Sequence, residues 1–413
     1  MQQSTFADLG VSDAVARALT ERGIESPFAV QKTVVPDVLA GHDVLVESPT
    51  GSGKTLAFGI PLVDRIRRGK GRPAGSPAAL VLAPTRELAS QIVDELSSIA
   101  KARSLSIIAV YGGAGINPQI RGARRADILV ATPGRLVDLL DRRAVSLGHV
   151  ELLVLDEADR MLDMGFRPVV DRLVALTPDR RQTMLFSATL AGEVDRIAKI
   201  YTSNARRHAH QVAPQARGKV EHRFLRVTRE GRTDNLITQL TEHERGRTLV
   251  FVRTKRGADR LAKQLGRVPT LNVAAMHGDK SQSQRERALS QFESGRIDTL
   301  VATDVAARGI DVRDVTHVIN FDAPGATEDY VHRVGRTARA GATGIGITFV
   351  MADQVREVVS MVAGLGLHRE LEAGGLPVSA RATSSPSISG GTARRRRSGR
   401  NRRPSGGRPS AAR

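Results

Sequence analysis

The chain has 413 residues, of which 40% are hydrophobic and 25% charged, a balance typical of soluble globular domains. This length is enough for two domains and a tail, while the absence of cysteine excludes disulfides, cysteine-ligated metal centres and a cysteine nucleophile. The formal net charge of +19 favours a polyanionic partner, and ten arginines without any acidic residue lie in 379–413.

Short apolar runs recur along the chain, and each is followed by a segment long enough for a helix. In the first half they lie at 44–46, 80–83, 107–110, 128–131, 152–155 and 184–186. In the second half they lie at 248–252, 273–276, 299–302, 317–321 and 346–350. Apolar strands that alternate with helices predict a parallel sheet with helices on both faces. Because the pattern occurs twice, we expect an α/β protein with two such domains.

Changes in composition set the expected domain limits. The predicted domains are 1–205 and 220–372, joined by a linker at 206–219 and followed by a tail at 373–413. The linker is polar and lacks hydrophobic periodicity. The tail is rich in Ser, Gly, Pro and Arg, so we expect it to be disordered. His208 and His210 fall in the predicted linker without carboxylate partners, so we expect no metal site there.

A phosphate-binding loop follows the first predicted strand. It reads Ser48-Pro49-Thr50-Gly51-Ser52-Gly53-Lys54-Thr55 and leads into an apolar helix start. Glycines let backbone N–H groups approach phosphates, and the helix N-terminus adds its positive end. Lys54 can neutralise the β- and γ-phosphates, and Thr55 can bind Mg²⁺. Ser48 replaces the first glycine of the general pattern. We therefore expect ATP and Mg²⁺ as cofactors.

Acidic residues end the predicted strand at 152–155, in the order Asp156-Glu157-Ala158-Asp159. Ligands bind at the carboxyl ends of the strands in a parallel sheet. We expect Asp156 to hold Mg²⁺, partly through water, and Glu157 to orient and deprotonate the attacking water.

The letters DEAD at 156–159 resemble the signature of the DEAD-box ATP-dependent RNA helicases, superfamily 2 proteins with two RecA-like domains. The resemblance covers roughly 6–367, with further motifs in the family's order and spacing. It implies an ATP-dependent RNA helicase that binds RNA backbone across both domains and locally separates short duplexes. The small size and short basic tail resemble bacterial members of the RhlE type.

The resemblance also implies a nucleotide site. Gln31 would read adenine, and Phe6, seventeen residues before Gly23, would stack on the base. The implied nucleotide-binding residues are Phe6, Gln31, Thr50, Gly51, Ser52, Gly53, Lys54, Thr55 and Asp311, the last at the ribose. Arg336 and Arg339 would be arginine fingers, because developing phosphate charge needs permanent planar donors. With Lys54, Asp156 and Glu157 they form the implied catalytic set.

One position in the last motif departs from the family. Ala338 stands where the family has Gly, and we expect this change to be mild unless the backbone φ there is positive.

RNA contacts are implied along the strand ends of both domains. Thr hydroxyls, backbone N–H groups and Arg side chains suit phosphate contact, and an aromatic content of 3% leaves few platforms for stacked bases. The implied RNA-binding residues are Pro84, Thr85, Arg86, Gly113, Thr132, Pro133, Arg135, Thr254, Gln282, Arg285 and Thr303. Ser187, Thr189 and His332 would couple the nucleotide state to domain closure.

Two other functions remain open from the sequence. A translocating DExH helicase would carry His at Asp159, and many of these have Gln at His332. An ATP-gated RNA clamp or annealing chaperone with little unwinding would carry the same motifs as a helicase. A strand-displacement assay beside an annealing assay distinguishes the clamp from the helicase.

Cellular context is an expectation only. No apolar run approaches the roughly 18 residues of a membrane helix, and the N-terminus lacks a secretory pattern. We expect a cytoplasmic bacterial monomer whose basic tail adds sequence-independent RNA affinity, with ribosome-assembly or RNA-decay complexes as candidate partners.

Overall fold

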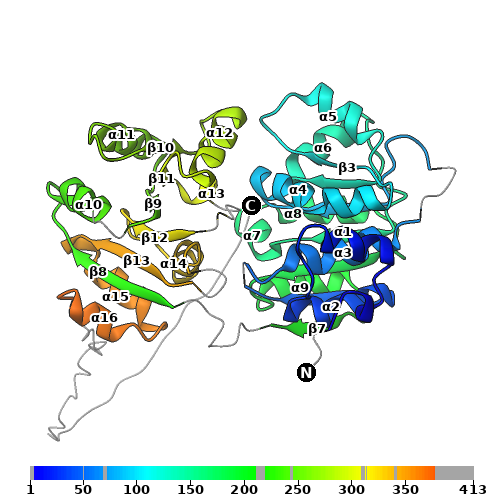
Figure 1. Cartoon of the computed structure of the whole chain (residues 1–413), viewed down its shortest axis with the longest axis horizontal. Helices are drawn as coiled ribbons and strands as arrows, with labels where there is room; N and C mark the ends of the chain where they lie inside the picture. The colour runs from blue at the N-terminus through cyan, green and yellow to red at the C-terminus, as the bar shows by residue number, and fades with distance from the viewer. Residues whose placement is uncertain are drawn as a thin grey trace, which may run out of the picture. The chain divides into compact units, whose positions relative to one another are not determined.

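In the computed structural model the chain forms two parallel sheets, each with helices on both faces (Figure 1). The structure describes residues 4–49, 51–67, 72–210, 219–241, 245–307, 312, 314–338 and 342–376. The predicted α/β class with two parallel sheets is confirmed. Within the described residues, no helix is both long and apolar enough to span a bilayer.

The first sheet belongs to the first domain. Its strands are β1 (Val44–Glu47), β2 (Ala79–Leu82), β3 (Ile107–Val110), β4 (Ile128–Ala131), β5 (Leu152–Leu155), β6 (Gln182–Ser187) and β7 (Arg206–Ala209). They lie in the order β3-β4-β2-β5-β6-β1-β7. Its helices are η1 (Ala7–Leu9), α1 (Asp13–Thr20), α2 (Ala29–Leu39), α3 (Lys54–Arg65), α4 (Arg86–Ala102), α5 (Ile116–Ala123), α6 (Pro133–Asp141), α7 (Ala158–Asp163), α8 (Arg167–Ala175) and α9 (Glu193–Tyr201).

The second sheet belongs to the second domain. Its strands are β8 (Val220–Arg226), β9 (Arg247–Phe251), β10 (Val273–Met276), β11 (Thr299–Ala302), β12 (Val315–Asn320) and β13 (Gly344–Val350). They lie in the order β10-β11-β9-β12-β13-β8. Its helices are α10 (Arg232–Leu240), α11 (Lys255–Leu265), α12 (Gln282–Glu293), α13 (Asp304–Ala307), α14 (Thr327–Val334), η3 (Ala352–Gln354), α15 (Val355–Ala363) and α16 (His368–Ala373).

The two sheets share one topology. The strands β8 to β13 occupy the places that β1 to β6 occupy in the first sheet. Both sheets are parallel throughout, so the loops after equivalent strands emerge at the same edge. This repeat places α11 in the second domain where α4 lies in the first, each directly after the equivalent strand β9 or β2.

Alternation along the strands builds a core on each side of the first sheet. Val81 packs into a cluster with α1 to α4, whereas Leu80 and Leu82 pack into a second cluster with α5 to α9. Because both of their faces are buried, the central strands β2, β4 and β5 are continuously apolar and carry no polar alternation. The polar residues therefore concentrate in the loops at the strand ends, where the candidate site lies.

The first domain extends further than the sequence predicted. β7 pairs with β1 as a parallel edge strand, so 206–209 belongs to the sheet and not to a linker. His208 Nε2 lies 3.0 Å from Asp37 Oδ2, so the expectation that His208 lacks a carboxylate partner was wrong. The partner is on α2, far away in sequence. Residues 211–218 of the predicted linker lie outside the described residues.

The predicted tail also begins later than expected. Leu376 is buried against Phe224 and Leu371 in a core cluster of the second domain, so 373–376 are packed and not disordered. Residues 377–413 lie outside the described part of the chain.

Candidate functional site

The phosphate-binding loop connects β1 to α3 and folds back on itself. Lys54 Nζ donates to the Ser48 carbonyl oxygen at 2.7 Å, and the Ser48 and Ser52 hydroxyls are 2.6 Å apart. Gly53 is the N-cap residue of α3 and has a φ of +89°, a left-handed conformation that favours glycine. Thr50 lies outside the described residues. The Lys54 ammonium is thus held at the loop, where a phosphate could replace the Ser48 carbonyl.

Gln31 joins α2 directly to this loop. Its Oε1 accepts from the Phe28 backbone N–H at 2.9 Å, and its Nε2 donates to the Gly53 carbonyl at 3.0 Å. The side chain is only 1% exposed. Each end of the amide thus makes one bond within the protein, which fixes its orientation, while a second N–H and a second lone pair stay available for a base.

Two phenylalanines near the loop differ sharply in exposure. Phe6 is 3% exposed and belongs to the core of the first domain, whereas Phe28 is 60% exposed. A Cβ added to Gly53 would lie 2.5 Å from a Phe28 ring carbon, so this ring covers the loop. Sequence reasoning missed Phe28, although a large aromatic three residues before Gln31 was a visible signal. Base stacking by Phe6 stays a prediction.

We expect Gly53→Ala to weaken ATP binding about 10–100-fold more than Gly165→Ala does. Both glycines have a positive φ, so both variants carry the same left-handed strain of about 1–2 kcal/mol. Only at Gly53 does a Cβ also overlap Phe28 and Gln31, which adds about 1–3 kcal/mol. Gly165 has no atom within 4 Å of its Cβ position and is the matched control. Equal ATP affinity in a titration of the two variants would contradict this account.

The acidic residues after β5 form a buried cluster with Lys54. Asp156 Oδ1 accepts from the Glu157 N–H at 3.0 Å, and burial raises the pKa of Asp156 to about 7 against the opposing charge of Lys54. A buried carboxylate of this kind is stabilised by a cation, which fits the residue to Mg²⁺.

Glu157 stays ionised because nearby cations lower its pKa by more than burial raises it. Burial raises its pKa, but Arg160, Arg336 and Lys54 together hold the pKa below its usual value. Arg160 Nη1 is 2.9 Å from Glu157 Oε2, and both side chains are buried. Glu157 also has a φ of +51°, a left-handed conformation that is strained for a non-glycine residue. Such strain is frequent at functional sites.

Residues of the second domain contribute to the same charge cluster. The charges of Arg336 and His332 both lower the pKa of Glu157. His332 lies in α14, and Arg336 lies two residues after the end of this helix. Arg336 is buried, and its Nε donates to the His332 carbonyl at 3.3 Å. Arg160, His332 and Arg336 line one small hollow. Arg339 and Asp311 lie outside the described residues.

The acidic cluster is connected to the loop after β6. Asp159 Oδ2 accepts from the Ala188 N–H at 3.0 Å, and the Thr189 N–H donates to Ser187 Oγ at 3.3 Å. A shift of Asp159 would therefore be transmitted to the strand end of β6. The coupling role of Ser187 and Thr189 stays a prediction.

Equivalent threonines cap the two helices that follow β2 and β9. Thr85 Oγ1 accepts from the Leu88 N–H at 3.3 Å, and Thr254 Oγ1 accepts from the Gly257 N–H at 3.0 Å. Each helix N-terminus presents N–H groups at the same edge of its sheet, an arrangement that suits phosphate.

The remaining predicted RNA residues of the first domain surround this edge. A Cβ added to Gly113 would lie 2.1 Å from Arg86 Nη1, so the guanidinium lies directly on the glycine. Arg135 donates to the Ala114 carbonyl at 3.1 Å, and Thr132 precedes the Pro133 that begins α6. Pro84 lies two residues after the end of β2. These residues therefore gather at one edge of the first sheet.

Arg285 has a partner that the sequence did not indicate. Its Nη2 lies 2.8 Å from Glu87 Oε1, and both side chains are buried. Tyr111 Oη donates to Glu286 at 3.2 Å beside this pair. Gln282 and Thr303 are buried as well. Arg285 thus contacts the first domain, in addition to any role at RNA.

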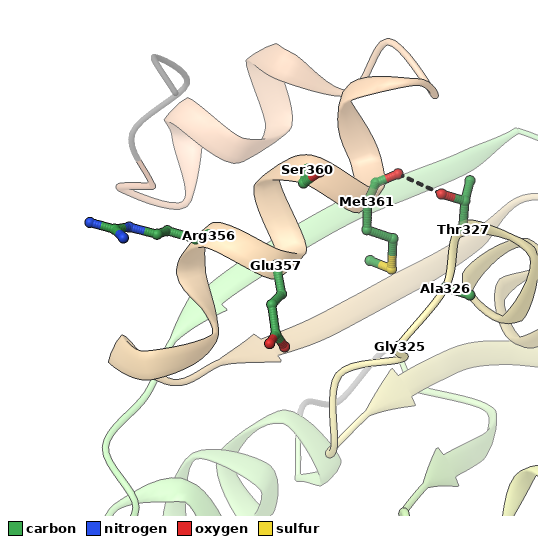
Figure 2. Close-up of a pocket in the computed structure, with 7 residues that line it drawn as sticks. All are labelled: Gly325, Ala326, Thr327, Arg356, Glu357, Ser360 and Met361. Carbon is green, nitrogen blue, oxygen red and sulfur yellow. Dashed lines mark hydrogen bonds between the residues drawn. The ribbon is translucent and has the colours of Figure 1, made fainter. Parts of the chain in front are cut away.

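A larger hollow lies away from these residues. Its volume is about 490 Å³, and it lies between α15 and the residues that begin α14 (Figure 2). Thr327 Oγ1 donates to the Met361 carbonyl at 2.9 Å at its side. None of the predicted nucleotide or RNA residues lines it, so it is not a candidate for the nucleotide site.

Comparison with known proteins identifies the family. A model of the DEAD/DEAH box helicases matches residues 28–197, and a model of the helicase conserved C-terminal domain matches residues 231–341. The ATP-dependent RNA helicase CshA of Limosilactobacillus reuteri is 39% identical over 353 residues, which cover 85% of this chain and 70% of that protein. The chain belongs to the DEAD-box ATP-dependent RNA helicases.

Other DEAD-box relatives are longer than this chain. DEAD-box ATP-dependent RNA helicase 40 of Arabidopsis thaliana is 42% identical over 349 residues, which cover 84% of this chain and 32% of that protein. Among solved structures, S. cerevisiae Dbp5 bound to RNA and ADP BeF3 has a TM-score of 0.77 at 30% identity, covering 88% of this chain and 93% of that one. Mss116p bound to ssRNA and AMP-PNP has a TM-score of 0.75 at 27% identity, covering 94% and 80%. The predicted pair of RecA-like domains is confirmed.

Ala338, which stands where the DEAD-box family has Gly, has a strained backbone conformation. Its φ is +55°, so the condition under which the Ala was expected to be mild is not met. We expect Ala338→Gly to raise the free energy of unfolding by about 0.5–1 kcal/mol, because left-handed strain of about 1–2 kcal/mol outweighs the extra unfolded-state entropy of Gly. Urea denaturation measures this gain. Ala262→Gly inside α11 should have the opposite sign, since Gly weakens helices. A loss of stability in both variants would contradict the assignment of strain.

Proposed function

We propose that this DEAD-box protein is an RNA-dependent ATPase that locally separates short RNA duplexes. The observation that carries the proposal is the buried charge cluster of Lys54, Asp156 and Glu157, on which Arg336 of the second domain acts. Its four residues supply two cations and two carboxylates for phosphoryl transfer, but only when both domains contribute. Hydrolysis is therefore expected to depend on whatever holds the domains together.

The residues have distinct roles in the proposed reaction. Lys54 exchanges the Ser48 carbonyl for the β- and γ-phosphates. Thr55 and Asp156 would hold Mg²⁺, partly through water, and the bound ion would supply positive charge beside the transferred phosphoryl group. Glu157 orients a water molecule and takes up its proton as the oxygen attacks phosphorus and the bond to ADP breaks. Arg336 and Arg339 stabilise the γ-phosphate in this step.

RNA binding is proposed at the matching strand edges of the two domains. Thr85 and Thr254 begin equivalent helices, so two similar phosphate sites are offered by the two domains. An RNA strand that contacts both sites follows a path set by the protein and not by its complementary RNA strand. Pairing is weakened where this path departs from helical geometry, which accounts for local strand separation.

ATP hydrolysis with and without RNA or DNA is the first test, with Lys54→Ala as the matched control. We expect RNA to stimulate phosphate release strongly and the variant to lose this stimulation. Equal stimulation by DNA would favour a less discriminating helicase. Absence of stimulation by either nucleic acid would contradict the proposed function.

Unwinding and clamping are then compared on the same RNA. We expect strand displacement to require ATP and to exceed annealing when the two reactions are measured side by side. Annealing without displacement would favour the ATP-gated clamp. We also propose that the protein is cytoplasmic, which agrees with the absence of cysteine. We propose further that it is a monomer, and sedimentation of the purified chain tests this state.

A further inference from the structure

A stripe of four cations covers the outer face of α11 in the second domain. Arg256, Arg260, Lys263 and Arg267 are all exposed, and Arg267 follows the C-cap residue Gly266, whose backbone is still right-handed. The spacing of four, three and four residues places them within about 60° of one another around a helix with 100° per residue. We call these four residues the α11 stripe.

The stripe faces away from the core. Ala258, Leu261 and Leu265 pack α11 into the core of the second domain, and they lie on the opposite side of the helix. The anchoring residues are therefore separate from the charged ones. Substitutions in the stripe can change charge without removing a packed side chain.

The charge of the stripe is not neutralised by the protein. In the part of the chain that the structure describes, none of the four cations has a carboxylate partner. The only carboxylate of α11, Asp259, lies 2.8 Å from Lys280 Nζ and 3.0 Å from His277 Nε2. The carboxylate on the helix is thus already paired with residues outside the stripe.

The equivalent helix of the first domain shows that this charge is not required by the fold. α4 occupies the same place after its strand and is capped by Thr85 as α11 is capped by Thr254. Its exposed charges are nevertheless mixed, with Asp94 and Lys101 seven residues apart on one face, while Glu95 is half-buried and paired with Arg22. The fold therefore does not require four aligned cations at this position, which points to a ligand of the second domain.

The geometry of the stripe fits a nucleic-acid backbone. From Arg256 to Arg267 the helix rises about 16 Å at 1.5 Å per residue. One strand of a duplex presents a phosphate about every 3.4 Å along the axis, so roughly five phosphates fall within this length. The stripe also begins two residues after Thr254, at the end of α11 where RNA is proposed to bind. RNA leaving that end would lie along the stripe.

We infer that the α11 stripe is a second RNA-binding surface, which holds the backbone of an RNA segment flanking the one bound at the strand edges. The inference rests on the proposed RNA-dependent function and adds to it. The stripe would favour substrates that carry a structured arm beside the single strand engaged by the two domains. Contacts to phosphates alone make this preference independent of sequence.

The test compares two RNAs with the full-length protein. One is a short single strand within a site size of roughly 4–16 nucleotides, and the other is the same strand with a flanking hairpin. The stripe variant combines Arg256→Gln, Arg260→Gln, Lys263→Gln and Arg267→Gln. A control variant combines Arg121→Gln, Arg124→Gln, Arg125→Gln and Arg142→Gln, four exposed cations of the first domain.

We expect the stripe variant to lose affinity for the hairpin RNA at least 10-fold at low salt and to keep its affinity for the short strand. The slope of log affinity against log salt should fall by about 3, since four phosphate contacts of about 0.7–0.9 each are removed. In the control variant the slope of log affinity against log salt should change by less than 1 for either RNA. Equal losses in both variants, or no loss in the stripe variant, would overturn the inference. No loss would leave an acidic protein as the ligand of the stripe.

Crosslinking provides a local measurement that the basic tail does not affect. Because the chain has no cysteine, Lys263→Cys and Arg125→Cys each create a single attachment site for a photoactivatable maleimide. We expect the hairpin arm to crosslink from position 263 and not from position 125. If RNA stimulates hydrolysis but this crosslink does not form, only the inference about the α11 stripe is overturned. If RNA does not stimulate hydrolysis by the unmodified protein, the proposed function is overturned.

Discussion

Replacing Glu157 with Gln should lower RNA-stimulated turnover by about 10²–10⁴-fold, the usual contribution of a general base. The carboxylate is ionised because Arg160, Arg336 and Lys54 outweigh the effect of its burial on the pKa. The amide has the same shape but cannot accept the proton of the attacking water. ATP and RNA binding should persist, because neither requires this proton transfer. Phosphate release and RNA affinity with a non-hydrolysable ATP analogue measure the two effects.

Glu151→Gln is the matched control for this prediction. Glu151 is exposed and precedes the same strand, β5, at the end away from the cluster. It should retain wild-type turnover and stability. Wild-type turnover in Glu157→Gln would remove Glu157 from the proposed role, and loss of ATP-dependent RNA binding would show that the carboxylate is needed for assembly of the site.

The central strands and the motifs at their ends could be predicted because burial on both faces makes them continuously apolar. The edge strands β7 and β8 were missed because they lack this continuous apolar pattern. Arg206–Ala209 is mostly exposed, and within Val220–Arg226 only Phe224 is buried, the other residues being exposed or half-buried. An edge strand pairs on one side only, so its sequence needs few apolar residues and resembles a polar linker.

The contacts within the site depend on residues that are far apart in sequence. The spacing of motifs indicated that Arg285 lies near RNA, but not that Glu87 faces it at 2.8 Å. Gln31 was expected at adenine, but its bonds to Phe28 and Gly53 are formed by the fold. Such pairs arise when helices from different parts of the chain meet, and no local pattern encodes them.

Backbone conformation was the other part that the sequence left open. Glu157 and Ala338 both adopt a positive φ, although neither is glycine. Local propensity would place both residues in extended or right-handed conformations. Tertiary packing imposes the left-handed conformation, so it became visible only in the structure.

Arg336→Ala should lower RNA-stimulated turnover by about 10³–10⁵-fold, as expected for an arginine finger. Arg336 lies on the second domain, yet its charge acts on Glu157 of the first. ATP binding to the first domain should remain close to wild type. Arg336→Lys should restore little activity, because an ammonium lacks the planar pair of donors that the γ-phosphate requires. Single-turnover hydrolysis with saturating RNA and ATP measures the loss.

Arg333→Ala provides a contrast from the same helix, α14. Arg333 donates to Asp304 Oδ1 and Oδ2 at 2.5 and 2.7 Å and to the Asp322 carbonyl at 2.7 Å, all within the second domain. Removing one partner of a buried ion pair destabilises a protein by about 3–5 kcal/mol. Arg333→Ala should therefore lower the free energy of unfolding, and by more than Arg336→Ala does, because Arg333 makes the bidentate contact with Asp304.

Measuring both quantities for both arginines separates the two roles. If Arg336 acts on the reacting phosphate, its variant loses far more turnover than folded protein, and the loss persists at low temperature where the protein is folded. If Arg336 only supports the fold, its variant resembles Arg333→Ala, and turnover falls in step with the folded fraction. The second result would contradict the division of the site between two domains, because the charge that reaches Glu157 would then serve packing and not hydrolysis.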